Sequence, residues 1–149
     1  MDWSKLNKIQ LGKYGEYYAK MMFTKYGFDV YSAEVDDKGI DFVIRKNEKE
    51  YFDIQVKAIR GYNFVFMRKK YFKPRQNLLV SLLVFKKNEE PTMLLFPSMA
   101  WKQKRYKYLV DYDYKGKKSA PEYAVRMSRK NMEAMKEEFS SEKQLRALA

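Results

Sequence analysis

The chain has 149 residues, of which 46% are hydrophobic and 17% aromatic, enough apolar material for one packed domain. It contains no cysteine and no histidine, which excludes disulfides, thiolate zinc sites and the most common general base. Lys and Arg number 31 and Asp and Glu 19, giving a net charge of +12. Any catalysis must therefore use carboxylates, amides, Lys, Tyr or Ser, and any metal should be an oxygen-preferring ion such as Mg²⁺.

The first predicted element is a helix over residues 4–26, closed by Gly27 as its C-terminal cap. Its expected apolar stripe is formed by Leu11, Tyr14, Tyr18 and Met22. Another face carries Gly12, Gly15, Glu16 and Ala19. Because each glycine costs a helix about 1 kcal/mol relative to Ala, we expect this face to approach another element closely, with Glu16 in the contact and paired.

A hairpin is predicted after a short strand at 28–31 and a polar loop at 32–39. Residues 40–45 alternate between apolar and polar, and so do residues 51–59. The five polar residues 46–50 between them have an ordinary length for a hairpin turn. We therefore expect two antiparallel strands that pair across this turn.

The remainder of the chain is dominated by predicted strands. We expect them over 63–67, 78–85, 92–96, 108–112 and 123–127. The run 78–85 is apolar on both faces, which is typical of a strand that is covered on both sides. A short helix should run from Pro97-Ser98 to Trp101, and a last helix should start near Ser128 with Met132, Met135 and Phe139 in one stripe. This pattern predicts one α+β domain over residues 1–149.

The register of the predicted hairpin brings three polar side chains together. If Arg45 faces Tyr51, antiparallel pairing places Asp41 opposite Gln55, with Cβ atoms about 4.5–5.5 Å apart. Lys57 follows on the same face, two steps further along the strand. A slip of one residue would turn Asp41 to the other face, so the pairing is specific.

This trio suits the hydrolysis of a phosphodiester, because a metal must offset the phosphate charge and deliver a hydroxide. Asp41 would be the anionic ligand, Gln55 would add a neutral carbonyl oxygen, and Lys57 would orient the water and stabilise developing charge. Glu16 could hold a metal-bound water or a second ion. Asp53 is a possible replacement ligand, although we expect it to be solvated or paired with a lysine.

Three motifs resemble the PD-(D/E)xK nuclease superfamily, in the variant that has Gln in place of the second acidic residue. They are Gly12-x-x-Gly15-Glu16, Gly39-Ile40-Asp41 and Gln55-Val56-Lys57, and they cover about residues 9–60. The resemblance implies a restriction-endonuclease-like core, an α/β/α sandwich whose mixed central sheet is flanked by helices. It also implies DNA cleavage with Mg²⁺, for which Mn²⁺ would substitute.

By position, the resemblance makes Asp41 the metal-binding acid and Lys57 the catalytic lysine. Gln55 takes the position of the second ligand, and Glu16 that of the acid on the first helix.

The excess of positive charge lies in residues 61–130, which hold 17 basic and five acidic side chains with aromatic residues between them. A localised basic surface with aromatic partners suits a polyanion, because phosphates release counterions and rings stack on bases. The expected DNA contacts are Arg68, Lys69, Lys70, Lys73, Arg75, Lys102, Lys104 and Arg105. Another basic cluster, Lys115-Gly116-Lys117-Lys118, follows them. The alternative is a generally basic protein whose rings belong to the core.

Two other functions stay open: a catalytically weakened nuclease fold that acts as a DNA-binding or regulatory module, and a structural or toxin-neutralising interaction protein that would not need the basic segment. Since cutting both strands of a duplex uses two active sites, we expect a homo-oligomer, either a dimer or a tetramer. No stretch approaches the roughly 18 apolar residues of a membrane-spanning helix, and the start lacks the features of a secretory signal. We therefore expect a cytoplasmic protein without a membrane partner.

Overall fold

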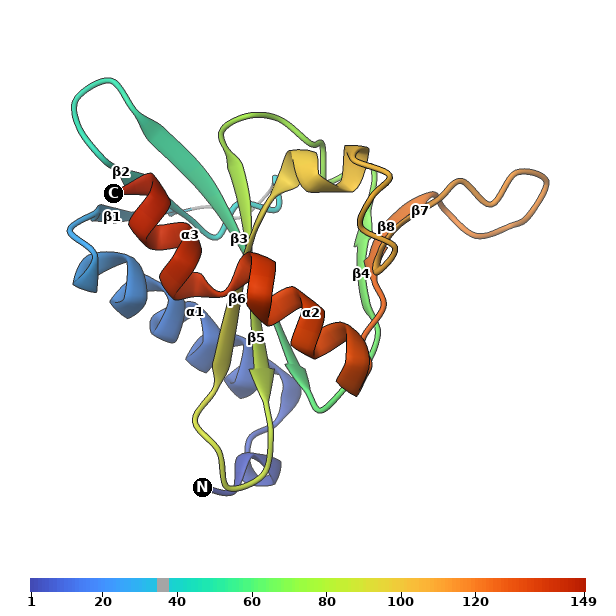
Figure 1. Cartoon of the computed structure of the whole chain (residues 1–149), viewed down its shortest axis with the longest axis horizontal. Helices are drawn as coiled ribbons and strands as arrows, with labels where there is room; N and C mark the ends of the chain where they lie inside the picture. The colour runs from blue at the N-terminus through green and yellow to red at the C-terminus, as the bar shows by residue number, and fades with distance from the viewer. Residues whose placement is uncertain (35–37) are drawn as a thin grey trace.

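The computed structural model describes residues 1–34 and 38–149, so part of the predicted loop at 32–39 lies outside the described residues. The helical elements are η1 (Trp3–Lys5), α1 (Lys8–Lys25), η2 (Ser98–Lys102), α2 (Arg129–Phe139) and α3 (Ser141–Leu148). The strands are β1 (Asp29–Ser32), β2 (Phe42–Arg45), β3 (Tyr51–Arg60), β4 (Val65–Arg68), β5 (Leu78–Phe85), β6 (Thr92–Pro97), β7 (Leu109–Tyr112) and β8 (Glu122–Val125). Figure 1 shows their arrangement.

The main sheet has five strands in the order β1-β2-β3-β5-β6. Strands β3 and β5 are parallel, whereas the other neighbouring pairs are antiparallel, so the sheet is mixed. Every residue of β5 is buried, which confirms the prediction that the run 78–85 is covered on both faces. The predicted α+β class, with a mixed sheet flanked by helices, is likewise confirmed.

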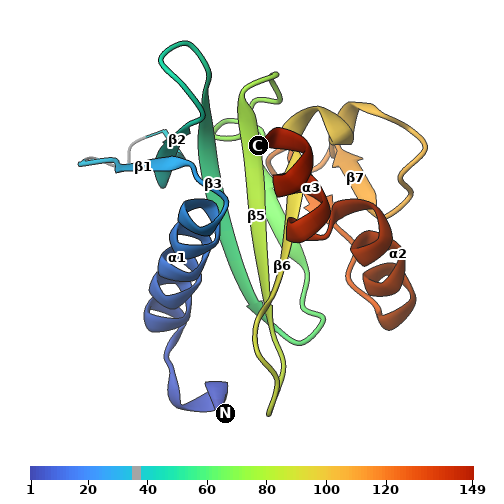
Figure 2. The same cartoon turned by 60° about the vertical axis from the view of Figure 1, so that its left-hand side comes forward.

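The two faces of the main sheet are covered differently. One face packs against α1 through a core that includes Phe23, Phe42 and Leu83. The other face packs against α2 and against a second, three-stranded sheet with the order β4-β8-β7. Figures 1 and 2 show α1 on one side of the main sheet and the short second sheet on the other. The sequence predicted these later strands but not that they separate into a sheet of their own.

Helix α1 differs from its prediction in where it begins and in which face it buries. It begins at Lys8 because Asn7 and Gln10 form a capping box, and residues 3–5 form a separate 3₁₀ turn. Its buried residues are Leu11, Gly15, Ala19 and Phe23. The expected stripe is confirmed for Leu11 and in part for Tyr18 and Met22, which are half-buried against the same core. It was wrong for Tyr14, which is exposed, because the small residues bring the helix backbone closest to the sheet.

The two glycines of α1 behave differently, and this gives a paired prediction. A Cβ on Gly15 would lie 3.1 Å from the Cβ of Ala58 on β3, whereas a Cβ on Gly12 would meet nothing within 4 Å. The close approach expected of this face thus holds for Gly15 and was wrong for Gly12. We expect Gly15→Val to lower the free energy of unfolding by about 1–3 kcal/mol through overpacking. Gly12→Ala, its control in the same helix, should raise it by about 0.5–1 kcal/mol, and urea denaturation measures both.

The single last helix predicted from Ser128 is two helices in the structure. Ser128 caps α2 as expected, but the chain leaves the helix at Ser140, whose hydroxyl accepts a hydrogen bond from the N–H of Lys143 and caps α3. Ser140 also forms a β-bridge with Leu94, on the outer strand β6 of the main sheet. Because of this break, α2 packs on the face of the main sheet that also contacts the second sheet, while Leu145 of α3 joins the core on the α1 face. Within the described residues, no helix has the length and hydropathy needed to cross a membrane.

Candidate active site

The predicted hairpin register is confirmed. Strands β2 and β3 pair with Arg45 opposite Tyr51 and Phe42 opposite Ile54. One residue before β2, the N–H of Asp41 donates to the carbonyl of Ile54 at 2.9 Å, and Oδ2 of Asp41 accepts from the N–H of Val56 at 2.6 Å. These two bonds flank Gln55. Asp41 therefore lies opposite Gln55, as the spacing predicted.

Gln55 and Lys57 share the face of β3 that points away from α1. Ile54 belongs to the core beneath α1, while Ile59 packs against the core on the opposite side. Because side chains alternate along a strand, Gln55 and Lys57 lie on the same side as Ile59. The structure thus brings Asp41 next to Gln55 at one end of a short row that continues to Lys57.

Gly39 allows the chain to pass close to Gln55. Its φ is +70°, which only glycine adopts readily, and a Cβ there would lie 3.6 Å from Nε2 of Gln55. The same Cβ would lie 3.2 Å from the carbonyl oxygen of Tyr71. Gln55 itself is only 8% exposed. The glycine of the Gly39-Ile40-Asp41 motif therefore has a structural reason, which is to bring the loop before Asp41 against Gln55 and the Tyr71 segment.

Glu16 is held by two lysines of its own helix. Its carboxylate pairs with Lys13 at 3.2 Å and with Lys20 at 3.1 Å. Burial acts to raise the pKa of Glu16, but hydrogen bonds from Lys20 and Lys13 outweigh it, and the net pKa is lowered. The pKa of Lys13 is raised, chiefly by its hydrogen bond and Coulomb attraction to Glu16, with a smaller contribution from Asp41. Glu16 is therefore ionised and paired, as expected. The positive charge of Lys13 is stabilised by the carboxylates of both Glu16 and Asp41.

Asp53 is paired with an arginine rather than with the expected lysine. Its Oδ2 lies 2.6 Å from Nη2 of Arg75, in a half-buried ion pair. The loop that carries Arg75 is fixed by Ser98, whose hydroxyl accepts from the N–H of Arg75 at 2.9 Å and donates to its carbonyl at 2.7 Å. Asp53 therefore anchors the segment that precedes β5, and Arg75, a predicted DNA contact, shares its charge with this carboxylate.

A basic cavity of about 430 Å³ opens beside Asp41 and Gln55. It is lined by Lys38, Ile40, Lys70, Tyr71, Lys73 and Arg75. Ile40 directly precedes Asp41, and the Tyr71 carbonyl lies against Gly39, so the cavity borders the candidate site. Four cations around one cavity favour an anion, since the positive field concentrates there. Three of the predicted DNA contacts, Lys70, Lys73 and Arg75, lie here, and Lys38 is a fourth cation that was not predicted.

The other predicted DNA contacts lie elsewhere on the surface. Lys69 pairs with Asp111 and, at 2.8 Å, with Asp113. Lys102 and Lys104 line a second cavity of about 420 Å³ between η2 and β7. Arg105 lies over the ring of Tyr106 and 3.9 Å from Glu138. Arg68 is exposed on β4. Of the eight residues, three line the cavity beside Asp41 and two line the second cavity, while Lys69 and Lys102 both lie over the ring of Tyr123.

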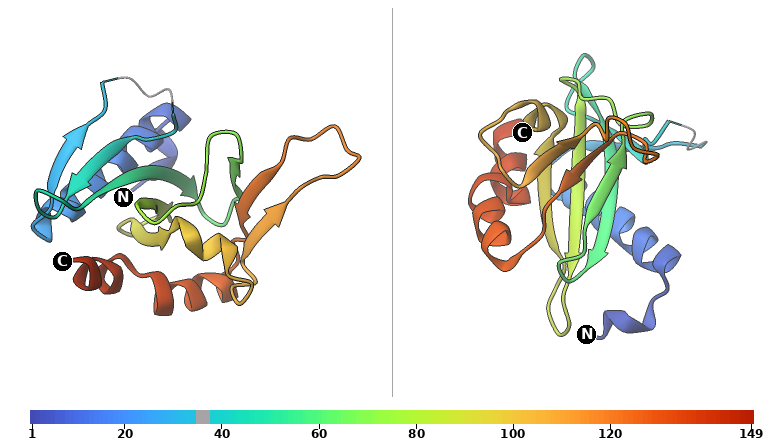
Figure 3. Two further views of the ribbon diagram at one scale, coloured as in Figure 1. Left: turned by 90° about the horizontal axis from the view of Figure 1, so that it is seen from above. Right: turned by 90° about the vertical axis from the view of Figure 1, so that its right-hand side faces the viewer.

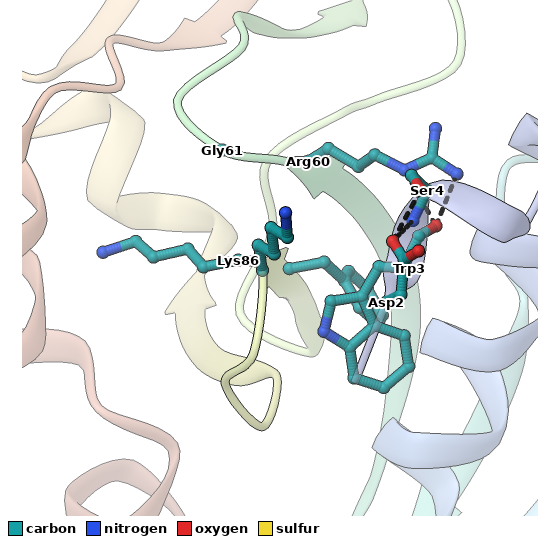
Figure 4. A pocket seen from close by; sticks show the side chains of 8 residues that line it. Asp2, Trp3, Ser4, Arg60, Gly61 and Lys86 are labelled. Atoms are coloured by element: carbon teal, nitrogen blue, oxygen red, sulfur yellow. Dashed lines mark hydrogen bonds between the residues drawn. The ribbon is translucent and has the colours of Figure 1, made fainter.

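A third cavity, of about 420 Å³, lies where the N-terminus meets the end of β3 (Figure 4). Arg60 donates from Nε at 3.1 Å and from Nη2 at 2.9 Å to the carbonyl of Trp3, and also to the carbonyl of Leu6. Lys86 donates to the hydroxyl of Tyr62 at 2.6 Å. Arg60 therefore fixes η1 to the end of β3, and Lys86 is engaged with Tyr62 in the loop that follows β3, so we regard these two contacts as structural.

The chemistry of the donors around Asp41 can be compared with the needs of Mg²⁺. Within residues 1–34 and 38–149, no three Asp or Glu side chains are grouped so that they could hold a metal. The donors present are the carboxylate of Asp41 and the amide oxygen of Gln55. Mg²⁺ commonly keeps several waters and uses one or two carboxylates together with substrate phosphates. These residues therefore fit an ion that is held weakly until a phosphate completes its ligands.

Comparisons with known proteins give a structural similarity but no match in sequence. No protein-family model matches the chain, and no curated protein matches it. Among solved structures, the chain is similar to Hjc, a Holliday junction resolvase from the archaeal hyperthermophile Archaeoglobus fulgidus. The sequence identity is 13% and the TM-score 0.46, over 77% of this chain and 83% of that chain. A similarity of this size does not assign a family or an activity, so function is inferred below from the residues.

Proposed function

We propose that the chain is a metal-dependent DNA endonuclease with a PD-(D/E)xK-type site on a restriction-endonuclease-like core, in the variant with Gln at the second ligand position. The observation that carries the proposal is that Asp41, one residue before β2, is hydrogen-bonded to β3 on both sides of Gln55, and that Lys57 shares the face of β3 with Gln55. The basic cavity beside this pair supports it, because a phosphodiester substrate is an anion.

Each residue has a role that follows from its chemistry. Asp41 and Gln55 would hold Mg²⁺ or Mn²⁺, with Asp41 supplying the charge and Gln55 a neutral oxygen. When bound, the ion offsets the charge on the phosphate and lowers the pKa of a coordinated water. The ammonium group of Lys57 would orient that water and stabilise the negative charge that develops on the phosphate. Glu16 lies on α1, which covers the opposite face of β3 from Gln55 and Lys57. Its proposed role is therefore confined to positioning a further water at the edge of the sheet, where its partner Lys13 also interacts with Asp41.

A second function, DNA binding without cleavage, is favoured by the small number of carboxylates that are left to hold a metal. Glu16 and Asp53 are each paired with cations, and the described residues contain no group of three acids. With one carboxylate and one amide, the site would hold a metal less tightly than two carboxylates would. A chain of this kind would bind DNA through the same basic cavity but would not cut it.

A plasmid assay tests the proposal against this alternative. Supercoiled DNA incubated with the protein should be nicked or cut in Mg²⁺ or Mn²⁺, and should stay intact in EDTA. Binding without nicking in either metal would favour the DNA-binding module. Equal nicking in EDTA would indicate a contaminating or metal-independent activity and would contradict the proposed site.

The basic cavity gives a prediction about salt. In the double variant Lys70→Ala/Lys73→Ala, DNA binding should weaken, and the slope of log K against log salt should fall in magnitude by about 2, because each lost phosphate contact contributes about 0.9. Fluorescence anisotropy at several salt concentrations measures this slope. The matched control is Lys46→Ala/Lys49→Ala, which removes two exposed lysines from the β2–β3 turn. Equal slopes for both double variants would remove the cavity from the DNA contact.

A further inference from the structure

The outward face of the second sheet carries aromatic rings that are not part of the core. Val65 and Met67 of β4 and Tyr123 and Val125 of β8 point into the core between the two sheets. Because side chains alternate, the neighbouring positions point outward. The registers place Phe66 beside Ala124 and Val110, and Arg68 beside Glu122 and Tyr112. The right-hand view of Figure 3 looks at the side of the molecule that carries these three strands.

Two stacked pairs of rings lie at the two edges of this sheet. Phe64 and Phe66 are 64% and 42% exposed, and their ring centroids lie 5.7 Å apart at an interplanar angle of 25°. At the opposite edge, Tyr112 of β7 and Tyr114, two residues further along the chain, are half-buried and stack at 5.3 Å and 15°. Large rings as exposed as Phe64 and Phe66 lose the stabilisation that burial would give them, so they mark a surface with a partner. Flat rings of this kind are well suited to stacking against other flat rings.

The charges around these rings favour a polyanion. Arg68 lies next to Phe66 on the same face of β4, and the guanidinium of Arg126 lies 3.3 Å from the hydroxyl of Tyr112. The loop between β7 and β8 extends beyond the body of the molecule in Figures 1 and 3 and carries the exposed Lys115, Lys117 and Lys118. Two acids of the same hairpin, Asp111 and Asp113, pair with Lys69. The third, Glu122, lies on the face itself and accepts a hydrogen bond from the hydroxyl of Tyr114 at 3.4 Å, so the cations there still outnumber it.

We propose that this outer face, defined by Phe64, Phe66, Arg68, Tyr112, Tyr114 and Arg126, binds unpaired bases of a nucleic acid, with the hairpin lysines on the adjoining phosphates. It rests on the proposed function in that the nucleic acid is the substrate of the Asp41 site, and it narrows that substrate to DNA with a single-stranded or splayed segment. Bases stack on exposed aromatic rings without regard to sequence, whereas in a closed duplex their faces are covered.

A second copy of the chain is the competing occupant. A symmetric contact through this face would bring Arg68 and Arg126 of one copy towards the same residues of the other, and would add the hairpin lysines of both. Like charges brought together across an interface oppose association. Nucleic acid combines flat apolar rings with negative charge, so it complements both features of this face.

The experiment measures binding in EDTA, so that cleavage plays no part. Fluorescein-labelled oligothymidylate and a labelled duplex are titrated with the parent protein and with Phe64→Ala/Phe66→Ala. We expect the affinity for the single strand to fall about tenfold or more and the affinity for the duplex to stay unchanged. The conservative variant Phe64→Tyr/Phe66→Tyr should keep single-strand affinity, and Tyr17→Ala/Met21→Ala, which removes exposed apolar side chains from α1, should not change it.

Three results would overturn the proposal. Unchanged single-strand affinity in Phe64→Ala/Phe66→Ala would show that bases do not stack there. Loss of a dimer in sedimentation velocity, with DNA binding retained, would assign the face to a second copy. Equal losses for single strand and duplex would indicate a general effect on DNA binding. The nuclease proposal fails separately, in the cleavage assays with Lys57 and Asp41 variants, because these binding experiments need no metal.

Discussion

Replacing Lys57 with Ala is expected to slow DNA cleavage by about 10²–10³-fold, the usual cost of removing one donor that stabilises transition-state charge. Lys57 lies on the face of β3 that carries Gln55, so we propose that both residues act on the same substrate phosphate. DNA affinity should change little, because one cation among the many on this surface contributes a small part of the salt-dependent binding. Plasmid nicking rates and anisotropy in EDTA measure the two effects separately.

Two further variants sharpen the Lys57 prediction. Lys57→Arg retains the charge but changes its geometry, so it should bind DNA like the parent and recover only part of the cleavage rate. Lys49→Ala removes an exposed lysine from the turn at the other end of the same hairpin and should cut at the parent rate. If Lys57→Ala cuts as fast as Lys49→Ala, Lys57 has no catalytic role.

Replacing Asp41 with Asn is the second change with a large expected effect. Asn retains an oxygen that can accept the hydrogen bond from the N–H of Val56, so the fold should be kept while the negative charge is lost. We expect metal binding to fall below detection in calorimetry and cleavage to fall by about two orders of magnitude or more, since Asp41 is the charged ligand of the proposed site. Circular dichroism on heating checks that the fold is intact.

Asp53→Asn is the matched control, because it makes the same chemical change on the same face of the hairpin. Asp53 is paired with Arg75, so its loss should reduce stability and leave metal affinity unchanged. Equal metal affinity for Asp41→Asn and the parent would exclude Asp41 as a ligand. Loss of metal binding in Asp53→Asn alone would show that the carboxylate ligand is Asp53 and not Asp41.

The parts of the site that were predictable from the sequence are those fixed by local geometry. The turn 46–50 and the alternation on both sides of it determine which residues face each other, and the pairing of Arg45 with Tyr51 followed. The covered strand 78–85 was equally local, because its apolar residues occupy both faces. The α+β class followed from the order of such elements.

Other features depend on contacts between distant segments, and the sequence carries weaker signals for them. The buried face of α1 is formed by Gly15 and Ala19 as much as by Phe23, so hydrophobicity alone selected a stripe that is shifted to one side of this face. Asp53 meets Arg75 only because β3 and β5 lie side by side in parallel, which no spacing reveals. The break at Ser140 did have a signal, since Ser140-Ser141 can end one helix and cap the next.

The central claim is that Asp41 and Gln55 together hold a divalent ion. Anomalous diffraction from a crystal soaked in Mn²⁺ tests this most directly, because it locates the ion without requiring turnover. The account predicts a peak between the carboxylate of Asp41 and the side-chain amide of Gln55, lost in Asp41→Asn. Peaks that appear only at other carboxylates, with none between these two residues, would contradict it.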